Sequence, residues 1–369
     1  MAGIKSWQLD LEEYIRQGEP DQAARSEAWQ IAIGLQQVDG LTPSKYLIDV
    51  AKEHIEGNIS IHEVHGRIQS YYEEQRDRKT HDLENEEADK VSLRITELLQ
   101  ENTFQFSPAE WLMIHRRIFG DIFVHAGQIR PYNITKKEWV LNGDTVIYAS
   151  CDSIRATMDY DFAMEKQFSY AGLSMEEIVH HLAEFVANVW QIHPFCEGNT
   201  RATAVFLIKY MRTLGLNVKN DSFKDHSWYF RNALVRANYN DLKKGIHATT
   251  VYLERFFANL LWGAGYELKN RYLNIDYAEE KDESSLSRTQ SLMEEIVKSQ
   301  NATLQYTQNE IKTLEYMKNN PSMRQMELAQ HVGVSLGTMK RITVRLQEKG
   351  CVKRSGPKNK GMWEVLIEI

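Results

Sequence analysis

The sequence predicts a mainly α-helical protein in which a small basic module follows a larger acidic part. Only seven of the 369 residues are proline, and apolar residues recur at helical spacing along most of the chain. Ser and Thr precede several of these segments and Gly follows them, which is the pattern of helix ends. Alternation typical of strands is confined to two short segments, 139–148 and 351–366.

Charge and composition exclude several classes of protein. The net charge of −7 does not suit binding of nucleic acid by the whole molecule. No apolar stretch approaches the roughly 18 residues of a membrane span, and the first residues lack the apolar core of a signal peptide. The three cysteines are widely spaced and show no metal-ligand spacing. We therefore expect a reduced, cytoplasmic setting and no membrane partner.

Four regions are expected along the chain. A helical segment covers residues 1–75, a larger helical domain covers 91–275, a polar linker helix covers 276–303, and a final module covers 304–369. The final module holds 11 Lys and Arg against 6 Asp and Glu, whereas the first 303 residues hold 33 against 45. Within the first segment, Ser26 is expected to cap a helix that ends at Gly40.

The segment HPFCEGNTR, residues 193–201, combines groups suited to phosphate chemistry. It joins a helix expected to end near His193 to an apolar helix expected to begin near Ala202. A helix N-terminus presents unpaired N–H groups and a partial positive charge to phosphate. Arg201 could clamp phosphate oxygens, Glu197 is a hard ligand suited to Mg²⁺, and His193 could accept a proton from an attacking hydroxyl.

HPFCEGNTR closely resembles the signature of the Fic family, commonly written HPFx(D/E)GNGR and followed by two residues and a second arginine. The resemblance implies a helical bundle with a β-hairpin flap that transfers AMP from ATP to a Ser, Thr or Tyr hydroxyl of a target protein. It implies that His193 is the catalytic base and Glu197 the Mg²⁺ ligand. The nucleotide contacts that it implies are Gly198, Asn199, Thr200, Arg201 and, farther along, Arg236, Asn238 and Tyr239. For the last three, the alternative is an ordinary amphipathic helix face.

Two positions depart from that signature. Thr200 replaces the second glycine, where a Cβ is unfavourable if φ must be positive. Ala204 replaces the second arginine, which in the family contacts the terminal phosphate. These departures leave the choice of nucleotide open. They also keep a second function class open, a nucleotide-sensing, DNA-binding regulator with little turnover.

The alternating segment around Asn142-Gly143 has the signal of a β-hairpin. By the resemblance it is the flap that holds a target segment through strand addition; the alternative is an ordinary edge hairpin. The flap residues expected to contact the target are Trp139, Val140, Val146, Ile147 and Tyr148.

The N-terminal segment resembles the small helical antitoxin of Fic proteins, which inserts a glutamate beside the phosphate clamp. Two acidic residues fit the inhibitory position in part. Asp39 precedes Gly40 at the expected place in the helix order, and Glu56 precedes Gly57 with the expected residue type. Both could instead be solvated residues at helix ends.

The last 66 residues resemble a winged helix-turn-helix domain. Three expected helices are joined by short turns, Ser335 caps the third, and a hairpin follows. The module binds DNA or serves protein contact; both remain open. Pairing of two copies is a further expectation from both resemblances. The residues expected to contact DNA phosphates are Lys340, Arg341, Arg345, Lys353 and Arg354.

Overall fold

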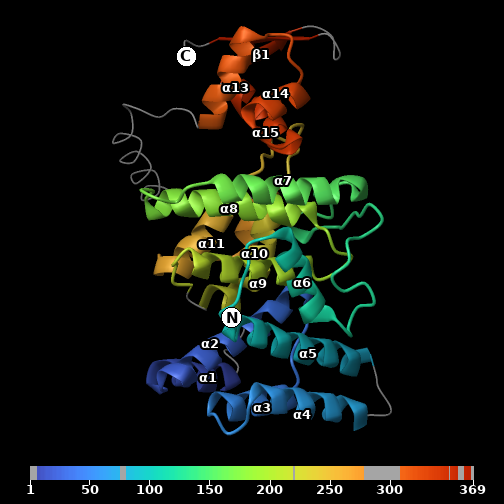
Figure 1. Ribbon diagram of the computed structural model, residues 1–369, viewed down its shortest axis with the longest axis vertical. Helices are drawn as coiled ribbons and strands as arrows, with labels where there is room; N and C mark the ends of the chain where they lie inside the picture. Colours follow the sequence, from blue (N-terminus) through green and yellow to red (C-terminus); the bar gives the residue numbers. More distant parts are fainter. Residues whose placement is uncertain are drawn as a thin grey trace. The chain divides into compact units, whose positions relative to one another are not determined.

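The computed structural model describes residues 6–74, 80–218, 221–277, 308–348, 350–355 and 361–366. Two compact units, Met1–Tyr277 and Ala278–Ile369, make up the chain. Helices dominate the first unit, and the second adds a small sheet (Figure 1). The expected linker helix falls in residues 278–303, outside the described part. None of the described helices is both long enough and apolar enough to cross a membrane.

The N-terminal helices pack around Trp29, which is fully buried. They are α1 (Ser6–Gln17), α2 (Pro20–Leu35), α3 (Lys45–Ile55) and α4 (Ile61–Glu74), with a 3₁₀ turn η1 at Gln36–Asp39.

Local capping rules account for most of their ends. Ser44 caps α3, and Gly40 ends η1 with a φ of 73°. The predicted cap at Ser26 is wrong, because α2 begins at Pro20 with Glu19 as its cap. Ser26 lies inside α2 and its hydroxyl donates to the carbonyl of Leu11.

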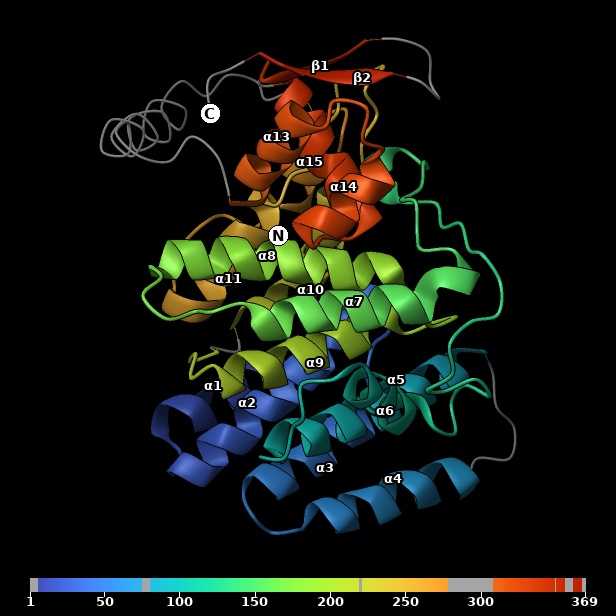
Figure 2. The same cartoon turned by 45° about the horizontal axis from the view of Figure 1, so that its top comes forward.

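The rest of the first unit surrounds helix α9, whose residues 199–211 are all buried. Helices α5, α6 and α8 contact α9 directly. Figures 1 and 2 place α7 and α8 on one side of α9, and α2 and α5 on the other. The helices are α5 (Thr80–Gln100), α6 (Pro108–Phe119), α7 (Ile154–Gln167), α8 (Met175–Ile192), α9 (Asn199–Thr213), α10 (Asp221–Ala237) and α11 (Val251–Trp262), with 3₁₀ turns η3 (Cys151–Ser153) and η4 (Asn270–Leu273).

Helix α2 belongs to the same core as α9. Ala28, Ile31 and Leu35 of α2 pack into the cluster that contains most of α9. Gly34 touches the backbone of α10 so closely that a Cβ there would lie 2.5 Å from the Lys224 carbonyl oxygen. The Ser227 hydroxyl donates to the Gly34 carbonyl over 2.6 Å. The segment 1–75 is therefore continuous in packing with the helices around the motif.

The segment between α6 and α7 is a folded loop, and the predicted β-hairpin at 139–148 is wrong. Residues 139–148 form no strand; they contain a 3₁₀ turn, η2, at Trp139–Leu141. Asn142 does adopt a positive φ, 54°, as the turn signal predicts. However, the loop closes on itself through short-range bonds such as that from the Glu138 amide to the Asp144 carbonyl, 2.9 Å. Val140, Val146 and Tyr148 are buried in the core, while Trp139 and Ile147 are exposed, without a strand ladder to organise them.

The second unit has the predicted three helices and hairpin. They are α13 (Gln308–Asn319), α14 (Gln325–Val332), α15 (Leu336–Glu348), β1 (Val352–Ser355) and β2 (Met362–Val365). The strands pair antiparallel, with Val352 opposite Val365 and Ser355 opposite Met362. The Ser335 hydroxyl accepts from the Thr338 amide and so caps α15. Lys358 and Lys360 of the hairpin lie outside the described residues.

Candidate active site

The turn between α8 and α9 has a shape that only certain residues allow. His193 ends α8 with a φ of 49°, which is uncommon for a residue with a side chain. Gly198 follows with a φ of 72°, and a Cβ there would lie 2.4 Å from the Phe119 ring. Glycine is therefore required at 198 by both conformation and space. The turn places the first N–H groups of α9 close behind His193.

Asn199 maintains this turn from within. Its Oδ1 accepts from the Phe195 amide at 3.0 Å, and its Nδ2 donates to the Phe195 carbonyl at 2.8 Å. The side chain is buried and both ends of the amide are used. The Asn199 side chain, expected to contact a nucleotide, is therefore committed to the loop.

His115 on α6 supports the same turn and was not foreseen. Its ring stacks on Phe195 at 3.7 Å between centroids. Its Nδ1 accepts from the Gly127 amide at 2.8 Å, so its Nε2–H donates to the Glu197 carbonyl at 2.9 Å. Burial lowers the pKa of His115 to about 4, which keeps this donor–acceptor pattern at neutral pH.

Arg130 connects the motif to the loop between α6 and α7, here called the covering loop. This role was not predicted from the sequence. Its Nε donates to the His193 carbonyl at 2.7 Å, and its backbone N–H donates to the Pro194 carbonyl at 2.8 Å. Its two Nη atoms donate to the carbonyls of Tyr132 and Ala149. Arg130 is buried, so its guanidinium satisfies three carbonyls that would otherwise lack partners.

His193 has the features of a general base. Its Nδ1 lies 3.3 Å from the Trp190 carbonyl, an acceptor, so the ring proton belongs on Nδ1. Its Nε2 is buried and has no hydrogen-bond partner among the described residues. Burial, with a smaller effect of the Lys136 charge, lowers the pKa of His193 well below its usual value. The imidazole is therefore neutral at physiological pH, with the Nε2 lone pair unused.

The two departures from the Fic signature have different consequences. Thr200 lies within helix α9, outside the positive-φ residues, so its Cβ causes no backbone strain. Its hydroxyl accepts from the Trp190 indole N–H at 2.9 Å, which ties α9 to α8. Ala204 is fully buried among apolar residues, and this position of α9 supplies no charge to the site.

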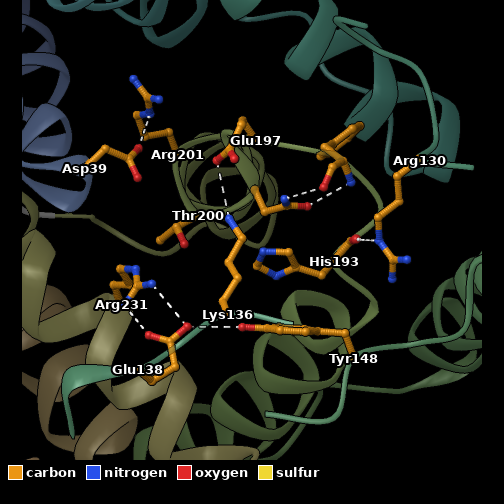
Figure 3. A network of polar contacts seen from close by, with 12 residues as sticks. Asp39, Arg130, Lys136, Glu138, Tyr148, His193, Glu197, Thr200, Arg201 and Arg231 are labelled. Carbon is orange, nitrogen blue, oxygen red and sulfur yellow. Dashed lines mark hydrogen bonds and ion pairs between the residues drawn. The ribbon is translucent and has the colours of Figure 1, made fainter. Parts of the chain in front are cut away.

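Arg201 is buried between η1 and α5, and Figure 3 shows its pair with Asp39. Its side chain is 2% exposed, and its Nε lies 2.8 Å from an oxygen of Asp39. Its Nη2 lies 2.8 Å from Glu87, and its Nη1 donates to Gln36 at 3.1 Å. Of the two acidic residues predicted for this position, Asp39 is therefore the one in contact. Glu56 is bonded instead to Tyr14 and Asn58.

Glu197 points away from the core and has a single described cation partner. Its side chain is 57% exposed, and its Oε2 lies 3.3 Å from Nζ of Lys136 on the covering loop. An exposed carboxylate already paired with a cation fits the expected Mg²⁺ ligand, because Mg²⁺ is commonly held by one or two carboxylates together with substrate phosphates.

The predicted flap residues divide into two groups. Ile147 and Trp139 are 82% and 52% exposed, which leaves them available to a partner. Val140, Val146 and Tyr148 are buried, and the Tyr148 ring packs 4.3 Å from the His193 ring. These three side chains are buried instead of presented to solvent, and Tyr148 covers His193.

Of the predicted base-contact residues, Asn238 and Tyr239 follow the end of α10 and are engaged in the fold. Arg236 lies on α10, and its Nε and Nη1 are buried without a hydrogen-bond partner among the described residues. Asn238 is buried and donates to the carbonyls of Ala187 and Leu234. The Tyr239 hydroxyl donates to Asp144 at 2.6 Å. Burial lowers the pKa of Arg236, which neighbours Tyr252. Asn238 and Tyr239 therefore make structural contacts where nucleotide contacts were expected.

In the second unit the predicted DNA contacts are mixed in exposure. Lys340 on α15 and Lys353 on β1 are exposed. Arg345 approaches Glu310 at 3.9 Å, and Arg354 lies over the Trp363 ring at 5.0 Å. Arg341 is partly buried on the same helix as Lys340.

Comparisons with known proteins agree with this division of the chain. Residues 105–211 match the model of the Fic/DOC family, and residues 306–359 match the model of the MarR family. Over 108 residues the chain is 27% identical to the protein adenylyltransferase VbhT of Bartonella schoenbuchensis, a match that covers 29% of this chain and 21% of that protein. The chain thus spans about a fifth of the length of this curated relative. The resemblance to Fic is confirmed for the segment that contains the motif.

Solved structures similar to the chain include Fic domains of Bartonella effector proteins. The N-terminal Fic domain of Bep8 from Bartonella sp. 1-1C has 18% sequence identity and a TM-score of 0.40, over 51% of this chain and 88% of that one. BepC from Bartonella tribocorum, solved with bound AMPPNP, has 19% identity and a TM-score of 0.40, over 51% and 90%.

Proposed function

We propose that the first unit transfers AMP from ATP to a Ser, Thr or Tyr hydroxyl of a protein. The observation that carries the proposal is the unused Nε2 lone pair of His193, buried beside the N-terminus of α9. The match of residues 105–211 to the Fic/DOC family supports the same reaction class. VbhT, 27% identical over 108 residues of this chain, is named a protein adenylyltransferase.

The proposed reaction uses groups whose positions are described above. The target hydroxyl oxygen attacks the α-phosphorus of ATP, and the bond from that phosphorus to the pyrophosphate oxygen breaks. The hydroxyl proton passes to Nε2 of His193, and pyrophosphate leaves. The first N–H groups of α9 face the phosphate oxygens, because they have no partner within the helix. Mg²⁺ held by Glu197 would neutralise charge on the leaving phosphates.

We further propose that Asp39 restrains this reaction. Asp39 and Glu87 neutralise the one arginine of the motif and hold its guanidinium against η1 and α5. An arginine paired with two carboxylates is a poor phosphate clamp, because the phosphate must compete for the same donors. The wild-type protein is therefore expected to work below its capacity, and to modify itself when the restraint is relieved.

Intact-mass analysis after incubation with each nucleoside triphosphate and Mg²⁺ tests the reaction. The wild type and Asp39→Asn are compared with His193→Ala in the full chain. We expect a mass gain of one AMP with ATP, larger in Asp39→Asn and absent from His193→Ala. No gain in the first two with any nucleotide, or an equal gain in His193→Ala, would reject the proposal. A gain matching a different group would correct the group transferred.

A second function is favoured by the MarR match at residues 306–359. In it the chain is a DNA-binding regulator, and the Fic segment binds a nucleotide with little turnover. Lys340 and Lys353 are exposed on α15 and β1, where they could meet phosphates. A gel shift of the full chain at low and high salt, with Lys340→Ala and Lys353→Ala for comparison, tests this function.

DNA binding that weakens with salt and with both variants supports the regulator. A gel shift that is unchanged by salt and by both substitutions would contradict it. In the same samples, the molecular mass in solution shows whether two copies of the chain pair, as proposed.

A further inference from the structure

Four cationic side chains surround the motif in Figure 3: Arg130, Arg201, Arg231 and Lys136. Three of them are fully engaged. The guanidinium of Arg130 donates to three carbonyls. That of Arg201 pairs with Asp39 and Glu87 and donates to Gln36. Arg231 makes a two-point pair with Glu138, at 2.6 and 3.2 Å. All three are largely buried: Arg130 is 1% exposed, and the side chains of Arg201 and Arg231 are 2% and 16% exposed.

Lys136 has fewer partners than the other three and is more exposed. Its ammonium has one described side-chain acceptor, Oε2 of Glu197, at 3.3 Å. The two side chains are 28% and 57% exposed. An ion pair this accessible contributes little free energy and breaks easily. Among the four, Lys136 is thus the cation that can leave its present partner.

The ammonium of Lys136 also lies close to the reacting groups. Its charge contributes to the lowered pKa of His193, which places it within electrostatic reach of the imidazole. Figure 3 shows the Lys136 side chain running beside His193 toward the first turn of α9. The backbone beneath it is fixed, because the Lys136 amide donates to Thr145 and the nearby Glu138 is locked by Arg231 and Tyr148.

We propose that Lys136 is the phosphate-binding cation of this site, and that its ammonium moves from Glu197 to the oxygens of a bound polyphosphate. The inference rests on the proposed function in taking a polyphosphate as substrate. The first turn of α9 supplies N–H donors but no exposed side-chain cation, since Arg201 is enclosed and Ala204 is apolar. Lys136 supplies the missing full charge from the covering loop, while Glu197 holds it in place when no anion is bound.

Calorimetric titration of the full chain with inorganic tripolyphosphate, in EDTA at low salt, tests this without turnover. Lys136→Gln should weaken binding about tenfold, the loss expected for one charge-assisted hydrogen bond. Lys136→Arg should retain most of the affinity. Lys137→Gln is the matched control, because Lys137 is the exposed next residue of the same loop. Its affinity should stay within about twofold of the wild type.

Glu197→Gln gives a prediction of opposite sign. Loss of its carboxylate releases Lys136, so metal-free tripolyphosphate should bind more tightly than to the wild type. The double variant Glu197→Gln, Lys136→Gln should lose that gain. A purely structural role of Lys136 would not reverse the sign in this way.

The outcomes separate the two proposals. Equal affinities of Lys136→Gln and Lys137→Gln overturn the role of Lys136, as does a Glu197→Gln variant that binds no more tightly. Absence of binding in both the wild type and Asp39→Asn overturns it too. Binding that depends on Lys136 without AMP transfer in the mass assay keeps this inference and rejects the transfer proposal.

Discussion

The two sides of the first turn of α9 contrast in how their charges are held. On the inner side, Arg201 is 2% exposed and pairs with two carboxylates, Asp39 of η1 and Glu87 of α5. On the outer side, Glu197 and Lys136 face solvent and hold only each other among the contacts described. The inner side fixes the geometry of the turn, and the outer side can exchange partners. A phosphate site needs both properties, because a rigid cradle must still release its resident ions to admit a ligand.

The largest expected effect concerns Arg130, a buried cation that holds the turn before α9 to the loop between α6 and α7. Arg130→Met leaves the carbonyls of His193, Tyr132 and Ala149 without this donor, and we expect a loss of about 4 kcal/mol in unfolding free energy. Urea unfolding followed by tryptophan fluorescence measures it, since seven of the eight tryptophans precede residue 278. Glu197→Gln, on the outer side, should change stability by less than about 0.5 kcal/mol. Similar losses in both variants would break the contrast.

A pH dependence of stability follows from the buried histidines. Burial lowers the pKa of His54 and of His115 to about 4, and the pKa of His193 is lowered as well. Below about pH 6.5 these histidines bind protons in the unfolded chain but remain neutral in the folded protein. The free energy of unfolding therefore falls as the pH drops from about 6.5 to about 4. For His115 alone the loss is about 3 kcal/mol.

Asp89 acts against this trend, because burial raises its pKa to about 6 and its protonation favours the folded state from about that pH down to 3.8. Asp89 is one group against four histidines, because burial also lowers the pKa of His226. Urea unfolding at several pH values gives the slope. A free energy of unfolding that rises toward pH 4 would contradict the burial of the histidines.

Gly198→Ala tests how tightly the turn before α9 is packed. The new Cβ meets the Phe119 ring and must adopt a positive φ, so we expect a loss of about 2 kcal/mol. Phe119→Leu in the same chain should recover part of the loss by giving the Cβ room. Thermal unfolding of the single and double variants measures the recovery. A double variant no better than the sum of the two single losses would show that backbone strain alone is responsible.

The smallest expected effect separates two acidic residues in matching local settings. Asp39 and Glu56 each precede a glycine of positive φ, at 73° and 81°, but only Asp39 contacts Arg201. Asp39→Asn should raise the rate of AMP incorporation about tenfold, within the usual range of coupling energies. Glu56→Gln should leave it within about twofold. Equal rates for the two variants would remove the proposed restraint by Asp39.

Local signals in the sequence located the motif turn and most of the helix ends. Ser44, Ser107 and Ser174 cap helices as their positions indicate, because a cap depends on residues only three apart. The three supporting residues His115, Arg130 and Lys136 carried no such signal. Their partners in the motif lie 82, 63 and 61 residues away. Alternation around Asn142 predicted a hairpin, since it reports burial on one face without saying what covers that face.

Helix α2 bears on the history of this gene as well as on its chemistry. An inhibitory helix that merely docked could be gained, lost or carried on a separate chain. Here Gly34 packs against the α10 backbone and Leu35 is fully buried in the cluster around α9. Loss of residues 1–75 would remove part of this core together with Asp39, so we expect the helices around α9 to be destabilised. Selection can retune the restraint one side chain at a time, but it cannot discard the segment that carries it.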